Sequence, residues 1–196
     1  MGISLTENFD RPYFSKSIAE YWRRWHMTLG SWMRDYLFYP LQKSNAFIKL
    51  GTWSRKKLGK KKGKYVPVVL SLFVLWLAMG VWHGANWNFI VWGLLFFVLM
   101  SFESLSGLGK RALKAANTKG FKVSKIFYHI YVVFFLLIAY VLFRAESLSV
   151  AWDYIKNMFG GTVNGFIDAD FIDYINNGKF ILIASILLCT PLARWV

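Results

Sequence analysis

The fold is decided by residues 66–102, which read VPVVLSLFVLWLAMGVWHGANWNFIVWGLLFFVLMSF. Two apolar runs, 66–83 and 87–102, flank a short polar turn in this stretch. Each run approaches the roughly 20 residues that an α-helix needs to cross the hydrocarbon core of a bilayer. The pattern therefore predicts a tight hairpin of two membrane-spanning helices over residues 66–103, with His83 at its tip.

Composition places the whole chain among membrane proteins. Of its 196 residues, 56% are hydrophobic and 19% are aromatic, which is not the composition of an ordinary soluble domain. Two more apolar segments, at 126–143 and 179–196, predict a third and a fourth span. We expect one all-α integral membrane domain over residues 1–196, with about four transmembrane helices, in the cell membrane.

The formal net charge of +14 is distributed unevenly along the chain. Residues 1–64 carry 14 basic and 4 acidic groups, residues 65–125 carry 6 and 1, and residues 126–196 carry 4 and 5. Lys and Arg beside membrane segments mark the cytoplasmic side, whereas a nucleic-acid-binding surface has no need of apolar runs between its basic patches. We expect the lipid bilayer and no nucleic acid as a partner, and a hairpin tip that faces outward.

Residues 1–64 are expected to form amphipathic helices at the membrane interface and a basic cytoplasmic loop. Ser17 and Glu20 form a capping-box pattern, which predicts a helix start near residue 18. Large apolar side chains recur at helical spacing from residue 22 to residue 36 and indicate one amphipathic helix, which Pro40 then interrupts. After it, the run RKKLGKKKGK at 55–64 predicts a flexible basic loop.

Residues 126–196 are expected to hold the third and fourth spans, joined by an acidic loop on the extracytoplasmic side. Within this loop, residues 147–159 predict a short surface helix. A glycine pair at 160–161 and an Asn-Gly step at 164–165 predict turns.

Two tryptophan-histidine dipeptides, at 25–26 and 82–83, supply the candidate catalytic residues. A titratable group at the end of a membrane span is costly to keep, so His83 is a functional candidate. An imidazole, with an unperturbed pKa of about 6.5, can take a proton from an acceptor hydroxyl near neutral pH. The same residues also fit an aromatic belt with polar turn residues, and His26 also fits a packed interface.

Neighbours of the two histidines are the candidate substrate-binding residues. Asn86 and Trp82 lie beside His83 in the sequence, and Trp25 and Arg24 precede His26. Guanidinium groups recognise phosphate and carboxylate well, but they also anchor to lipid headgroups.

Several other site types find no support in the sequence. The three histidines lack the paired spacing of a metal site, and the single Cys189 lies in an apolar run, so we expect no metal. Neither a Gly-x-Ser-x-Gly elbow nor a phosphate-binding loop is present, which argues against a serine hydrolase and an ATPase.

Four motifs, in their order and spacing, resemble one known family: RPYF at 11–14, YWRRWHMTL at 21–29, WHGANW at 82–87 and FRA at 143–145. They are similar to the membrane-bound O-acyltransferases, particularly the bacterial branch that O-acetylates alginate. The branch that transfers D-alanine to teichoic acid is similar in the block at 21–29. The resemblance implies a histidine in a membrane tunnel that moves an acyl group from a thioester to a hydroxyl. His83 matches the catalytic histidine of the family, and His26 matches its second polar position.

The resemblance also implies the substrates and partners. The donor is expected to be acetyl-CoA or another acyl thioester, with no bound cofactor. The acceptor is expected to be a polysaccharide hydroxyl or a serine of an extracytoplasmic partner of the SGNH-hydrolase type. Because family members carry additional membrane helices before the matched region, we expect this chain to be the C-terminal portion of a larger bundle.

Three alternative functions are open at this point. The chain could be a catalytically incomplete scaffold or interaction subunit, or it could take part in D-alanyl transfer to teichoic acid. A channel or transporter is less well supported, because the spans contain no repeated or discontinuous-helix pattern.

Overall fold

The computed structural model describes residues 2, 5–118, 120, 122–160, 167 and 169–189, and all secondary structure in these residues is helical. They belong to two compact units, residues 1–144 and 145–196. The first unit contains η1 (Pro12–Phe14), α1 (Ile18–Arg24), α2 (Met27–Met33), η2 (Arg34–Phe38), α3 (Tyr39–Lys43), α4 (Asn45–Gly63), α5 (Tyr65–His83), α6 (Trp87–Ser106), α7 (Leu108–Asn117) and α8 (Val123–Arg144). The second contains α9 (Leu148–Met158) and α10 (Ala169–Leu188).

Four of these helices, α5, α6, α8 and α10, are long and apolar enough to cross a membrane. The all-α membrane fold and the predicted number of spans are thus confirmed. Three of the spans agree closely with the predicted ranges. The fourth begins at Ala169 rather than at residue 179. Polar residues at 170–178 lower the hydropathy of this stretch, so the prediction left it out of the span, but they do not prevent it from forming a helix. Residues 190–196 of the predicted fourth span lie outside the described residues.

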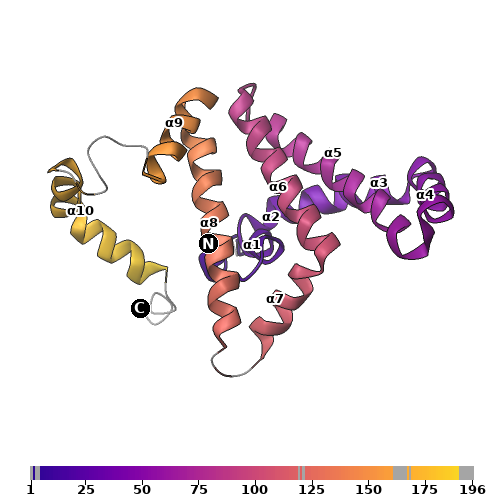
Figure 1. Ribbon diagram of the computed structural model, residues 1–196, viewed down its shortest axis with the longest axis horizontal. Helices are drawn as coiled ribbons and strands as arrows, with labels where there is room; N and C mark the ends of the chain where they lie inside the picture. The colour runs from indigo at the N-terminus through magenta and orange to yellow at the C-terminus, as the bar shows by residue number, and fades with distance from the viewer. Residues whose placement is uncertain are drawn as a thin grey trace. The chain divides into compact units, whose positions relative to one another are not determined.

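Helices α5 and α6 lie side by side as an antiparallel hairpin (Figure 1). Two glycines permit their close approach: a Cβ at Gly93 would clash with the carbonyl oxygen of Trp76, and a Cβ at Gly80 would clash with that of Phe89. Small residues let membrane helices pack backbone against backbone in this way. The hairpin therefore has a defined register, and its tip has a defined position.

The tip of the hairpin is a short, well-capped turn. His83 is the last residue of α5, and Gly84 follows with φ 148°, a value that favours glycine. The side chain of Asn86 accepts a hydrogen bond from the backbone N–H of Asn88 at 3.2 Å and so caps α6. The backbone thus places His83 at the tip, where the sequence predicted it.

The N-terminal helical segment is broken at its tryptophan-histidine dipeptide, residues 25–26. Helix α1 begins at Ile18, and the Ser17 hydroxyl accepts a hydrogen bond from the Glu20 N–H at 3.0 Å, so the predicted helix start is confirmed. The prediction of one helix through residue 36 is wrong. Residues 8–10 lie against the break and supply the hydrogen bonds that a continuing helix would have made. The Asp10 N–H donates to the Arg24 carbonyl, and the Met27 N–H donates to the Asn8 carbonyl, each at 2.9 Å.

Pro40 does not interrupt the helical segment, contrary to the prediction. It lies in the first turn of α3, where a missing N–H costs little, and it follows the π-helical turn η2.

The predicted flexible loop at 55–64 is also wrong, because α4 covers nearly all of it. Helix α4 bends at Gly59, where φ is 77°, and folds back on itself. The Ser54 hydroxyl then donates to the Gly63 carbonyl at 2.8 Å. The lysines remain exposed to solvent, so their repulsion does not prevent the helix.

In the second unit, α9 agrees with the predicted surface helix at 147–159. The Ser147 hydroxyl caps it by accepting a hydrogen bond from the Val150 N–H at 3.2 Å. Gly160 lies in a turn, whereas the other predicted turn positions, 161 and 164–165, lie outside the described residues.

An aromatic cluster forms the core between α1 and the hairpin. The Trp22 ring makes edge-to-face contacts with Trp76, Trp92 and Phe96, at centroid distances of 4.8, 5.8 and 5.1 Å. Such pairs contribute beyond the apolar area that they bury. This cluster fixes α1 against the hairpin and forms one wall of the cavity described below.

Candidate functional site

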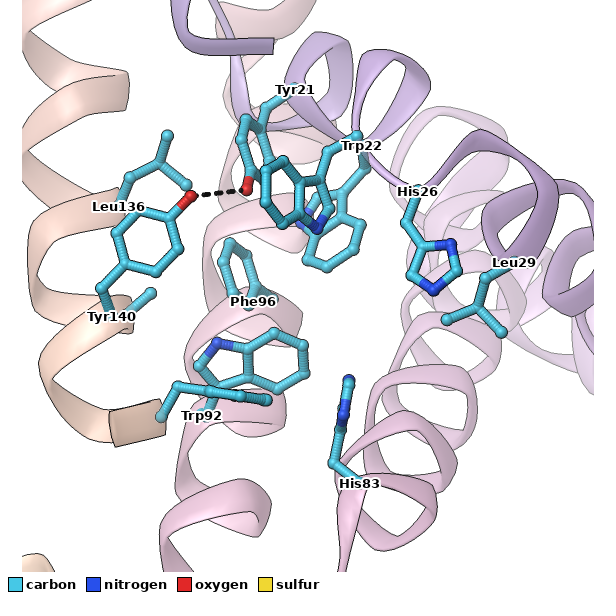
Figure 2. Close-up of a pocket in the computed structure, with 12 residues that line it drawn as sticks. Tyr21, Trp22, His26, Leu29, His83, Trp92, Phe96, Leu136 and Tyr140 are labelled. Atoms are coloured by element: carbon cyan, nitrogen blue, oxygen red, sulfur yellow. Dashed lines mark hydrogen bonds between the residues drawn. The ribbon is translucent and has the colours of Figure 1, made fainter. Parts of the chain in front are cut away.

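His26 and His83 line the same cavity, although they lie far apart in the sequence (Figure 2). The cavity has a volume of about 170 Å³. Its walls come from the α1–α2 region, from α5, from α6 and from α8. The lining residues are Tyr21, Trp22, Trp25, His26 and Leu29 of the N-terminal segment, His83 of α5, Trp92 and Phe96 of α6, and Leu136, Ala139, Tyr140 and Phe143 of α8. The two tryptophan-histidine dipeptides thus meet in space.

The His83 imidazole is half-buried among aromatic rings. Its ring centroid lies 5.0 Å from that of Trp92 and 5.0 Å from that of Phe143, both in edge-to-face contact. Trp82 contacts it at 4.7 Å. These rings restrict the orientation of the imidazole and leave one side of it open to the cavity.

His26 reaches the cavity because its backbone is left-handed, with φ 48° and ψ 51°. A side chain with a Cβ rarely adopts this conformation, and such strained residues cluster at functional sites. The imidazole Nδ1 lies 3.4 Å from the Asn8 Oδ1. The break between α1 and α2 therefore serves to turn this side chain toward His83.

Asn8 holds the break in place, a role that no sequence pattern indicates. Its Oδ1 accepts hydrogen bonds from the Thr28 N–H at 3.1 Å and from the Thr28 hydroxyl at 3.0 Å. It thus caps α2 from a distance, since His26 makes no side-chain cap of its own. A local capping pattern could not have revealed it, because Asn8 lies outside the helical segment.

Three tyrosines connect the cavity wall to η1. The Tyr140 hydroxyl donates to the Tyr13 hydroxyl at 3.2 Å, so its other partner, Tyr21 at 3.1 Å, donates to it. Burial raises the pKa of the Tyr21 phenol, which therefore keeps its proton and remains a donor. This chain of hydroxyls joins α8 to α1 across one wall of the cavity.

The Trp22 indole lines the cavity and carries a buried polar atom. Its Nε1 is buried and has no hydrogen-bond partner among the described residues. A buried N–H without a partner costs about 1–3 kcal/mol. Trp22 also lines a second cavity of about 630 Å³, whose wall includes Arg23, Arg34 and Thr28. This indole is therefore shared by the two cavities.

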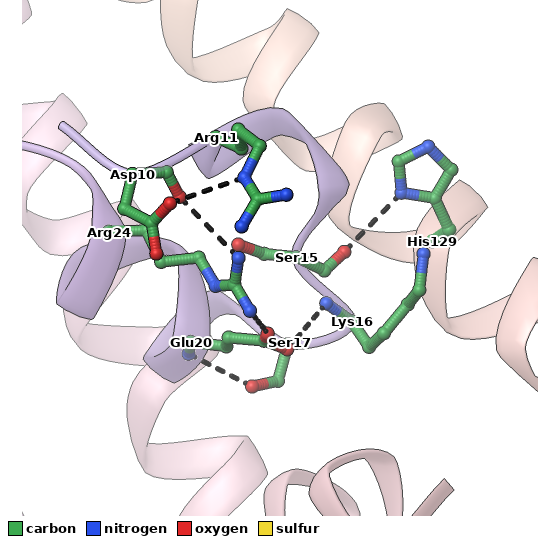
Figure 3. A network of polar contacts seen from close by, with 8 residues as sticks. All are labelled: Asp10, Arg11, Ser15, Lys16, Ser17, Glu20, Arg24 and His129. Carbon is green, nitrogen blue, oxygen red and sulfur yellow. Dashed lines mark hydrogen bonds and ion pairs between the residues drawn. The ribbon is translucent and has the colours of Figure 1, made fainter. Parts of the chain in front are cut away.

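The other predicted binding residues have different positions. Trp25 lines the histidine cavity, whereas Trp82 is 56% exposed and contacts His83 from its side. Asn86 caps α6. Arg24 forms an ion pair with Glu20 at 2.8 Å (Figure 3). The structure brings Trp25 together with both histidines and gives Asn86 and Arg24 local structural contacts.

The third histidine, His129, lies on α8 and does not line the histidine cavity. The His129 Nδ1 lies 3.4 Å from the Ser15 carbonyl oxygen (Figure 3). Within the described part of the chain, no group of three or more His, Cys, Asp or Glu side chains is placed to hold a metal ion.

The sequence did not reveal most of the cavity wall that α8 supplies. Tyr140 and Phe143 of α8 line the cavity, although only Phe143 belongs to one of the four sequence motifs. Tyr140 lies inside an apolar span in which nothing distinguishes it from lipid-facing neighbours.

No protein-family model matches the chain, but curated proteins do. It is 35% identical over 161 residues to the probable alginate O-acetylase AlgI of Pseudomonas aeruginosa, an alignment that covers 81% of this chain and 26% of the relative. It is 34% identical over 159 residues to the peptidoglycan O-acetyltransferase of Helicobacter pylori, covering 81% of this chain and 26% of that protein. It is 40% identical over 101 residues to the teichoic acid D-alanyltransferase of Bacillus subtilis, covering 52% and 23%. The chain spans about a quarter of the length of these relatives.

Proposed function

Because this chain is a homologue of the membrane-bound O-acyltransferases, we propose that it carries the reaction centre of an enzyme that O-acylates a cell-surface polymer. The observation that supports this proposal most is the convergence of His26 and His83 on one cavity of a membrane-spanning helix bundle. Histidines placed in this way can move a proton between an acceptor hydroxyl and a leaving group.

The proposed reaction is transfer of an acyl group from a thioester to a hydroxyl. An imidazole nitrogen of His83 accepts the proton of the hydroxyl while its oxygen attacks the acyl carbon. The carbon–sulfur bond then breaks, and the same proton passes to the thiolate, so that an ester and a thiol are released and the imidazole is restored. His26 orients the reactants, and the unpartnered Trp22 N–H is the proposed donor to the developing oxyanion.

The size and lining of the cavity favour a small acyl group. Its volume of about 170 Å³ is close to the roughly 150 Å³ of an engineered cavity that binds benzene. An acetyl group and the carbon that bears the acceptor hydroxyl fit this space. Trp92, Phe96 and Ala139 supply an apolar surface for the acetyl methyl group.

D-alanyl transfer is a second candidate, supported by the match to the Bacillus D-alanyltransferase. A D-alanyl group carries an ammonium, and its burial in a dry site costs far more than the roughly 2 kcal/mol that an aromatic face offsets, so it needs a carboxylate partner. The lining residues given above include aromatic faces but no carboxylate. This favours acetyl as the primary proposal, with D-alanyl as the competing substrate in the test.

Charge gives the proposed direction of transfer. Helix α7, with Lys110, Arg111 and Lys114, lies at the opposite end of α6 from the hairpin tip (Figure 1). Basic residues favour the cytoplasmic side, so the histidine cavity would open near the outer surface. The donor, acetyl-CoA or another acyl thioester, would approach through the larger cavity, where Arg23 and Arg34 suit phosphate groups. The acceptor would be a polysaccharide or a serine of an SGNH-type partner, in the plasma membrane or at its outer face.

The competing proposal is a membrane scaffold or interaction subunit that retains the family motifs without turnover. The two proposals differ in one measurable respect. A change at His83 would leave acylation unchanged in a scaffold but would abolish it in the enzyme.

The test measures transfer of labelled acetyl from acetyl-CoA to cell-surface polymer in membranes that contain the complete protein encoded by the reading frame. Wild type, His83→Ala and the control Asp153→Asn are compared, with labelled D-alanyl thioester as a second donor. Asp153 is exposed on α9 and pairs with Lys156 at 2.7 Å, so its loss should not affect turnover. The proposal predicts transfer by wild type and control but not by His83→Ala. Equal transfer by all three would overturn it.

A further inference from the structure

Glu103 is a buried carboxylate for which the proposed reaction has no use. It is 3% exposed and lies near the end of α6, a membrane span. Burying a carboxylate in a span is expensive, and such residues are usually retained for function. Glu103 shares one face of α6, at helical spacing, with Trp92 and Phe96, which line the histidine cavity.

Both carboxylate oxygens hold the first turn of α1. Oε1 accepts a hydrogen bond from the Ile18 N–H at 2.6 Å, and Oε2 accepts one from the Ala19 N–H at 3.0 Å. These are among the N–H groups that a helix start leaves without intrahelical partners, and the helix dipole favours a negative charge there. Glu103 therefore acts as a cap supplied from a distant part of the chain.

The local cap is already provided by other residues. The Ser17 hydroxyl accepts from the Glu20 N–H, and the Glu20 carboxylate accepts from the Lys16 N–H at 2.9 Å and pairs with Arg24 (Figure 3). Glu103 thus adds what these contacts lack, a direct connection between α1 and the membrane hairpin. The Tyr131 side chain of α8 lies beside the same carboxylate.

This connection controls the position of helix α1. It has seven residues, carries Tyr21 and Trp22 into the cavity and leads directly into Trp25 and His26. A short helix moves as a rigid rod, so a shift at Ile18 is passed on to the side chains of the cavity. A misplacement of about 1 Å in a reaction centre can cost roughly 100-fold in rate.

We propose that Glu103 is a positioning residue that holds α1 against α6 and thereby sets His26 and Trp22 in the reaction cavity. The inference rests on the acyltransferase function proposed above. In this proposal Glu103 itself does not contact the substrate.

The test compares Glu103→Gln with wild type in the complete protein, with kcat measured per correctly inserted molecule. A glutamine can accept with its one oxygen, but its NH₂ opposes the second backbone donor, so α1 should shift. We expect kcat to fall roughly 10- to 100-fold while the KM for the thioester changes less than about twofold. A carboxylate with only a fold-stabilising role would lower the amount of inserted protein and leave kcat unchanged, and that result would overturn the proposal.

Two further variants keep the test decisive. If Glu103→Gln does not accumulate, Glu103→Asp keeps the charge and shortens the reach, and a wild-type kcat in that variant overturns the proposal. In a His26→Ala background, Glu103→Gln should lower kcat by a smaller factor than in the wild-type background, because part of its effect acts through His26, and an equal factor in both backgrounds would overturn the proposal. If His83→Ala leaves transfer intact, the proposed function fails. If His83→Ala abolishes transfer and Glu103→Gln keeps a normal kcat, only the present inference fails.

Discussion

The two tryptophan-histidine dipeptides look alike in the sequence but are positioned by different means. His83 ends a regular helix, and the hairpin that carries it is built from adjacent segments with a short capped turn. His26 lies in a left-handed break between two seven-residue helices. Residues 8–10 hold this break through backbone hydrogen bonds, and the Asn8 side chain adds a contact with the His26 imidazole.

The difference shows how strongly each histidine depends on distant residues. The hairpin tip is determined by contacts between neighbouring helices, so its geometry should withstand changes elsewhere. The α1–α2 break depends on Asn8 and, through α1, on Glu103. We therefore expect changes far from the cavity to affect His26 more than His83.

The largest expected effect comes from removing the imidazole at the hairpin tip. His83→Ala should lower kcat for acetyl transfer roughly 10³-fold, because a general base is lost. Membrane insertion should remain normal, since a half-buried side chain at a helix end contributes little to the core. The assay is labelled acetyl transfer normalised to inserted protein, and substantial turnover by this variant would remove the role assigned to His83.

Removing the other imidazole should have a smaller effect. His26→Ala should lower kcat roughly 10²-fold if His26 orients the reactants rather than accepting the proton. His26→Asn should lose less, because asparagine is polar and tolerates the left-handed backbone at this position. Comparison of kcat for the two variants in the same assay separates the contribution of the imidazole from that of the left-handed backbone. Equal losses in kcat would argue against a backbone contribution.

Hairpin geometry is tested by Gly93→Ala. The added methyl would meet the Trp76 carbonyl, so α5 and α6 must separate. We expect a loss of about 1–3 kcal/mol in the free energy of unfolding, measured as a lower thermal midpoint in detergent. Gly178→Ala in α10 is the matched control, since a Cβ there meets nothing within 4 Å. Similar midpoints for both variants would contradict the close packing of the hairpin.

The smallest expected effect concerns the residue that holds the break. Asn8→Ala removes the cap of α2 and the contact with the His26 imidazole, at a cost of about 1 kcal/mol in stability. It should also lower kcat several-fold, whereas Asn45→Ala, at the exposed start of α4, should not. A change in stability without any change in kcat would show that the break does not need Asn8 to place His26.

The sequence predicted the hairpin well because its signals are local. Continuous apolar runs of span length, a Gly-Ala-Asn turn and the position of His83 can all be read along the chain. The start of α1 was also predictable, since its Ser17 cap lies next to it.

Three of the failures have a common physical origin, which is contact between residues that are not neighbours in the sequence. The helix break at His26 depends on residues 8–10, and the fold-back of α4 depends on the Ser54–Gly63 hydrogen bond. Glu103 looks like an isolated acid at a helix end, and only the structure connects it to Ile18. Periodicity describes one segment at a time, so it could not find these residues or the cavity wall that α8 contributes.

The central claim is that both dipeptides belong to one reaction centre, and a double-mutant cycle tests it most directly. Acetyl transfer is measured for wild type, His26→Ala, His83→Ala and the double variant. Residues that act as a unit are strongly non-additive, so the double variant should be no more than about threefold slower than His83→Ala alone. If the two losses instead multiply to roughly 10⁵-fold, the histidines act independently, and the shared cavity would not be the reaction centre.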